Sequence, residues 1–204
     1  AEDGIRDYKV TGVQTCALPI YFNNIALRIK AVNPDIVIPA NYYNEYVLLV
    51  RTLQQQRIVP KAIYSVLGGG ASSYQFVKEF PEASNGIIDC NHWFNPKNPK
   101  VAELRKRVEA QGKFFTYEVF LTYAATQVLI DAIERAGSAK REAITAALAS
   151  STFANHIMPY GPTKFVNGQN EGAQPMMTQV VGGDIKVIFP TDFRETQPVF
   201  PLKG

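Results

Sequence analysis

Two tyrosines that follow a short apolar segment are the residues of this sequence best suited to meet a small molecule. Tyr42 and Tyr43 come directly after the apolar run at 36–38 and its Pro-Ala-Asn stop. In open α/β sheets, ligands bind just outside the carboxyl ends of the strands. Because adjacent residues of an extended chain point in opposite directions, we expect only one of the two tyrosines to face a ligand.

A triple glycine, Gly68 to Gly70, lies between a second apolar run and a helix start. It matches neither the dinucleotide-binding pattern nor a phosphate loop, because no Gly-Lys-Ser/Thr follows. Two interpretations stay open. The backbone N–H groups could meet a ligand carboxylate at a helix N-terminus, or the glycines could form only a tight turn between strand and helix.

Glu118 and Trp93 each allow two interpretations as well. Glu118 stands at the head of a long apolar helical segment, where the helix dipole favours an exposed acid. It could instead be a carboxylate directed into a cleft. Trp93 lies in an aromatic segment broken by proline, 91–96, which reads as a connection. It could line a cleft or pack at that connection.

Metal binding and catalysis are not indicated. His92, His156 and Cys90 stand in no metal-ligand spacing, and His156 lies far from the other two in the sequence. No G-x-S-x-G motif is present. Cys90 ends an apolar run and reads best as a small buried hydrophobic residue. We therefore expect neither a metal nor a cofactor.

Length and composition indicate a globular protein. The 204 residues are 46% hydrophobic and 19% charged, which suffices for a sizeable core in one large domain or two small ones. The net charge of +3 is spread along the chain, so a nucleic-acid partner is not expected. No apolar run reaches the roughly 18 residues that a membrane span needs.

The elements that must position these residues alternate between helix and strand. Apolar periodicity predicts this order over residues 22–90, with helices and strands in turn at 22–32, 35–40, 44–55, 62–66, after Ser72 or Ser73, and at 87–88. Such alternation is typical of a parallel sheet with helical crossovers. The unbroken apolar runs further predict strands that are buried on both faces.

The second half of the chain predicts helices first and strands last. Helices are expected at 99–111 and 117–136, and a third begins with Ser138 as its cap. The helix at 117–136 is apolar on most faces, so we expect it to be buried. A strand and turn follow at 161–168, and Gly182-Gly183 predicts a hairpin between strands at 177–181 and 185–189.

Residues 1–20 show no helix or strand periodicity and resemble the translation of a short-read sequencing adapter over their whole length. We therefore expect a non-native segment, comparable to an expression tag. Cys16 would then not be a natural cysteine, which leaves Cys90 without an intrachain disulfide partner. The natural chain would begin upstream of Tyr21.

Several segments after Tyr21 occur in a characteristic order and spacing: IALRIKAVNPDIVIPANYYNE, LVRTLQQQ, GGG, NPKVAELRKRVEAQGK, TYAATQVLIDAIERAGS, REAITAAL, GPTKFVNGQN and VVGGDIKVIFP. Together they resemble the later part of the substrate-binding proteins of branched-chain amino acid ABC transporters, the Leu/Ile/Val-binding type. The resemblance extends from Tyr21 to Gly204.

This resemblance implies an incomplete, two-lobed α/β fold of the type I periplasmic binding proteins, with parallel sheets flanked by helices. It implies that 21–90 is a remnant of the second lobe and that 91–165 returns into the first lobe. Residues 166–204 would form a C-terminal hairpin and a tail near the hinge, and the hinge itself would include Asn91, His92 and Trp93.

In proteins of this family an aromatic residue after the first of these strands lines the pocket, which corresponds here to Tyr42 or Tyr43. A carboxylate after the next strand often holds the ligand ammonium group. Leu67, Gly68 and Gly69 occupy that place here, so the acid is absent. The long helix usually starts with an aromatic residue where this chain has Glu118. We hypothesise that Glu118 takes over the ammonium-binding task.

The resemblance implies a solute-binding component of an ABC importer that captures an amino acid, an amide or an aromatic acid. It would act in the periplasm or on a lipid anchor, deliver its ligand to a membrane permease and have no enzymatic activity. The alternatives are a soluble ligand-sensing regulator with the same fold and, less favoured, an α/β enzyme.

Overall fold

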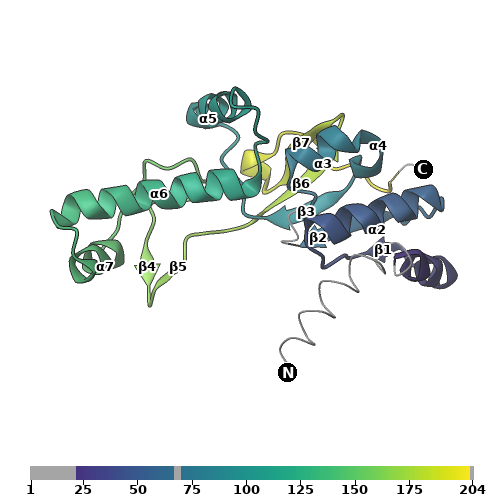
Figure 1. The fold of residues 1–204 in the computed structure, drawn as a ribbon, viewed down its shortest axis with the longest axis horizontal. Coiled ribbons are helices and arrows are strands. Elements are labelled where there is room, and N and C mark those ends of the chain that lie inside the picture. The colour runs from purple at the N-terminus through teal and green to yellow at the C-terminus, as the bar shows by residue number, and fades with distance from the viewer. Residues whose placement is uncertain (1–21, 67–69, 203–204) are drawn as a thin grey trace, which may run out of the picture.

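The computed structural model describes residues 22–66 and 70–202 and contains a five-stranded sheet (Figure 1). The predicted segment 1–20 and Leu67, Gly68 and Gly69 lie outside the described residues. In sheet order the strands are β1 (Ile36–Val37), β2 (Ala62–Val66), β3 (Ile88–Asn91), β6 (Met176–Val181) and β7 (Asp184–Phe189). The first three run parallel, and β6 and β7 are antiparallel to their neighbours.

The predicted alternation of helix and strand over 22–90 is confirmed. Residues 22–32 are helical, and α2 (Tyr43–Gln55), α3 (Tyr74–Glu79) and α4 (Pro81–Ser84) follow in order. Ser73 caps α3, since its hydroxyl accepts a hydrogen bond from the backbone N–H of Gln75. The strand predicted at 35–40 is shorter than expected, because its ladder with β2 extends over only two residues.

The first strand segment is covered on one face only, and this corrects the expectation that it is buried on both faces. Val37 of β1 is buried, and buried side chains of the sheet pack against α2, α3 and α5 (Pro99–Glu109). On the described structure Ile36, Ile38 and Val66 remain 50%, 62% and 42% exposed. The unbroken apolar run therefore does not predict burial on both faces here, since part of it faces solvent.

An arm extends away from the sheet (Figure 1). It contains the long helix α6 (Tyr117–Ala136), α7 (Arg141–Ala149), and a small hairpin of β4 (Phe165–Val166) and β5 (Gln169–Asn170). The bounds of α6 are those predicted, but its expected burial is wrong. Only the stripe of Phe120, Ala124, Val128 and Ala132 is buried, while Ile130 is 50% exposed.

The prediction for the end of α6 is confirmed, whereas the prediction for the start of α7 is not. Gly137 adopts the left-handed conformation after α6, as predicted for a glycine stop. The prediction that Ser138 caps α7 is wrong, because Lys140 is the N-cap residue. The Ser138 hydroxyl instead accepts a bond from the N–H of Lys140 within the connecting turn.

The C-terminal hairpin predicted around Gly182 and Gly183 is confirmed. Both glycines have positive φ (61° and 79°), as the two-residue turn between β6 and β7 requires. The short 3-10 helix η1 (Thr191–Phe193) follows. None of the described helices is both long and apolar enough to cross a bilayer.

Candidate ligand-binding site

The carboxyl ends of β1, β2 and β3 meet at one edge of the sheet, and the N-terminus of α6 lies at the same edge. The loop between β2 and α3 contacts the start of α6 directly, because Ser73 in this loop forms an antiparallel bridge with Thr116 before α6. Figure 1 shows the starts of α2 and α6 on the side of the sheet from which the arm extends. Segments far apart in the sequence thus share the edge at which open α/β sheets bind ligands.

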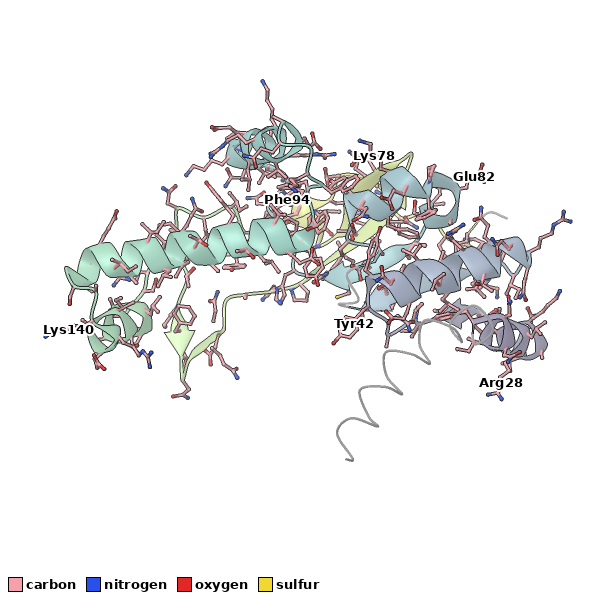
Figure 2. All side chains as sticks on the ribbon, in the orientation of Figure 1. Arg28, Tyr42, Lys78, Glu82, Phe94 and Lys140 are labelled. Carbon is pink, nitrogen blue, oxygen red and sulfur yellow. The ribbon has the colours of Figure 1, made fainter. Side chains whose placement is uncertain are left out.

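The two tyrosines after β1 point in different directions, as expected. Tyr43 packs against the core formed by α2, α3 and β2, and burial raises the pKa of its hydroxyl to about 12. Tyr42 is the N-cap residue of α2 and is 85% exposed. It projects freely from the start of α2 (Figure 2). Tyr42 is therefore the tyrosine that is available to a ligand.

Tyr42 is near the first turn of α6. Burial, followed by the charge of Glu118, raises the pKa of Tyr117, and Asp89 and Tyr42 are close enough to add to the shift. Glu118 itself is exposed and Tyr117 is half-buried. The structure thus brings Tyr42 and Glu118, two of the predicted site residues, to one place.

Sequence reasoning missed two members of this edge, Tyr117 and Asp89. Tyr117 directly precedes Glu118, so its position beside a candidate acid was a usable signal. Asp89 is the only charged residue in β3 and is completely buried. A lone acid within a strand is unusual, and that signal was also present in the sequence.

The charged side chains of this edge are acidic. Among the described residues, no lysine or arginine contributes to the raised pKa values of Tyr117, Tyr64 or Asp89. No group of three potential metal ligands occurs in the part of the chain that the structure describes. The arrangement therefore favours a ligand with a positively charged nitrogen over an anionic one.

The segment that leaves β3 is part of the core. Asn91 is buried at the end of the strand, and Trp93 is completely buried. The Trp93 ring stacks on Phe94 at 4.9 Å and meets Phe120 of α6 edge-on at 5.1 Å. Of the two interpretations of Trp93, the structure favours packing at the connection. The role of Asn91, His92 and Trp93 as a hinge stays a prediction.

Gly70 is the last glycine of the run and its one described member, and it lies directly against Tyr46. A Cβ atom added at Gly70 would overlap the ring of Tyr46 and touch its Cβ, which the helix α2 holds in place. We therefore expect Gly70→Ala to lower the free energy of unfolding by about 1 to 3 kcal/mol. Urea unfolding measures this loss.

Gly161→Ala is the matched control for this substitution. A Cβ at Gly161 would meet nothing within 4 Å, so its stability should change by less than about 0.5 kcal/mol. Equal effects at Gly70 and Gly161 would contradict the close packing of the loop on α2.

The sequence profile of the periplasmic binding protein family matches residues 9–184. The chain belongs to this family. No curated protein sequence matches it significantly. The family match confirms the expected resemblance and, together with the sheet and its helices, the expected type I α/β fold.

Solved structures with this fold resemble the chain over most of its length. A leucine binding protein from Thermotoga maritima has 25% identity and a TM-score of 0.67, and the match covers 81% of this chain and 47% of that protein. A periplasmic binding protein type 1 from Bordetella pertussis has 17% identity and a TM-score of 0.61. The match covers 79% of this chain and 48% of that protein.

A third structure is a solute binding protein of an ABC transporter from R. palustris in complex with benzoate. It has 19% identity and a TM-score of 0.68, and the match covers 82% of this chain and 46% of that protein. The chain thus spans about half the length of these structures. The assignment of its parts to two lobes stays a prediction, as do the ligand contacts of the site residues.

Proposed function

We propose that this chain is part of an extracytoplasmic solute-binding protein that captures a small amine-bearing molecule for an ABC importer. The family match and the structural resemblance to transporter binding proteins support the proposal. An amino acid is the ligand class that fits best. A membrane permease is the proposed receiver of the ligand, and no chemical step on the ligand is proposed.

The observation that carries the proposal is the convergence of Tyr42 and Glu118 at the carboxyl edge of the sheet, from positions 76 residues apart. An exposed phenol and an exposed carboxylate that both act on Tyr117 can hold an apolar side chain and an ammonium group, respectively. Closure of two lobes around such a ligand would be a population shift that the ligand drives.

Replacement of the acid tests the ligand class. We expect Glu118→Gln to weaken binding of L-leucine about tenfold, because a charged hydrogen bond to the ammonium group becomes a neutral one. Butylamine, which carries the ammonium group but no carboxylate, should lose affinity to a similar extent. Isothermal titration calorimetry on both probes measures the change.

Glu103→Gln is the matched control, since Glu103 is an exposed acid on α5 and the same charge is lost. It should leave leucine binding unchanged. A Glu118→Gln variant that binds leucine as well as the Glu103→Gln variant does would exclude Glu118 as the ammonium partner.

A further inference from the structure

A chain of buried polar groups connects the loop before α3 to the end of β3. The Ser72 hydroxyl donates a hydrogen bond to Oδ2 of Asp89, and Nδ2 of Asn91 donates to the Ser72 oxygen at 3.3 Å. Oδ1 of Asn91 in turn accepts from the backbone N–H of His92 at 2.8 Å. We call Ser72, Asp89 and Asn91 the polar relay.

The relay is inside the protein. Ser72 and Asp89 have no exposed surface and Asn91 has 2%. Ser72 belongs to the loop that continues from the glycine run, and its neighbour Ser73 bridges to Thr116 at the start of α6. The relay therefore lies directly beneath the candidate ligand-binding edge and touches the connection at His92.

The carboxylate at the end of the relay is unfavourable for folding. Burial raises the pKa of Asp89 to about 6, and the hydroxyl of Ser65 and the N–H of Cys90 limit the rise. Among the described residues, no donor makes a well-formed hydrogen bond to its Oδ1 atom. A buried carboxylate with one bonded oxygen costs free energy that an apolar residue of similar size would not.

We propose that Asp89 is a positioning residue for the candidate ligand-binding site: its carboxylate holds Ser72, and through Asn91 it couples the loop at 70–73 to the connection at His92. The proposal deepens the proposed function, on which it rests for its biological meaning. Asp89 does not contact the ligand in this account. It fixes the loop that forms one wall of the site.

The coupling depends on the charge of Asp89. An ionised carboxylate is a stronger hydrogen-bond acceptor than a neutral carboxyl or amide. The titratable groups that interact with Asp89 are Tyr46 of α2, Tyr64 of β2 and Tyr117 of α6, each with a pKa raised above its ordinary value. They stay neutral near pH 6, so Asp89 alone should produce the transition there.

Amide hydrogen exchange tests the relay without any ligand. The informative amides are those of Ser73, Gln75 and His92, which bond to Gly70 O, Ser73 Oγ and Asn91 Oδ1, respectively. At about pH 7.5 we expect Asp89→Ala and Ser72→Ala to speed their exchange about tenfold, because a charge-assisted hydrogen bond is lost. Asp89→Asn should speed it only a few-fold, since its amide oxygen still accepts from Ser72.

The pH profile separates positioning from a general structural role. Corrected for intrinsic chemistry, protection of these amides in the unmodified protein should fall as pH drops through about 6, the pKa of Asp89. Asp89→Asn should show no such transition. His92→Gln should keep it, which excludes the nearby imidazole as its origin.

Three results would overturn the proposal: unchanged exchange in Ser72→Ala, a transition that persists in Asp89→Asn, or one that disappears in His92→Gln. Asp192→Asn is the control for the chemical change, since Asp192 is exposed on η1, and it should alter none of these amides. If neither leucine nor butylamine binds, the proposed function fails, and the exchange data still decide on the relay.

Discussion

Asp89→Asn should make the protein more stable at neutral pH by about 2 to 3 kcal/mol. The pKa of Asp89 rises from 3.8 to about 6 on folding, a shift of about two units, and each unit corresponds to about 1.4 kcal/mol. The neutral asparagine removes the need to bury a charge, and its amide oxygen can still accept the hydrogen bond of Ser72.

The sign of the effect fixes its pH window. The folded state binds the Asp89 proton more tightly than the unfolded state does, so the stabilisation from the neutral form is complete below about pH 4 and is lost as pH rises through about 6. The advantage of Asp89→Asn should therefore vanish near pH 4 and be complete near pH 8. Urea unfolding across this range measures it.

A less stable Asp89→Asn variant near pH 8 would contradict this account of the buried carboxylate. The polar relay predicts a second and opposite effect in the same variant, because amides of the loop at 70–75 should exchange faster while the whole protein is more stable. Opposite changes in local and global stability are the signature of a residue that is retained for a site at the expense of stability.

Trp93→Ala should lower the free energy of unfolding by about 3 to 5 kcal/mol, the usual range for loss of a buried large aromatic side chain. Trp93 is completely buried and contacts the rings of Phe94, Phe120 and Tyr74. Figure 2 shows Phe94 among the side chains between α5 and the start of α6. Thermal and urea unfolding measure the loss.

Trp93→Phe refines this prediction. The indole N–H of Trp93 is buried and has no hydrogen-bond partner among the described residues, so phenylalanine loses volume but also removes an unpaired donor. It should cost well under half of the alanine effect. Leu27→Ala, at a 55% exposed helical position, should change stability by less than about 0.5 kcal/mol. If Trp93→Ala lowered the free energy of unfolding as little as Leu27→Ala does, the packing described here would be contradicted.

Local signals predicted the elements well where the sequence carries a specific start or stop. Helix α6 has the predicted bounds because Gly137 ends it, and the Gly182-Gly183 turn fixes the C-terminal hairpin. The position of β6 beside β3 could not be predicted in this way. It pairs residues 85 to 91 positions apart, such as Asp89 and Thr178, and no local pattern encodes such a pairing.

Burial was predicted less well than secondary structure, because an apolar run does not say how many faces are covered. Ile38 in the first strand segment and Ile130 in α6 are both largely exposed on the described structure. For the site, alternation along the chain predicted that one of Tyr42 and Tyr43 would be free. It could not say which, since the answer depends on how α2 packs.

The central claim is that the carboxyl edge of the sheet binds a small amine-bearing solute. Amide NMR spectra of the chain, recorded with L-leucine, butylamine or benzoate at up to about 10 mM, test it directly and detect even weak binding. We predict saturable shifts at Tyr42, Ser73 and Glu118 with the two amines and none there with benzoate. Shifts elsewhere only, shifts with benzoate alone, or none with any probe would contradict the claim.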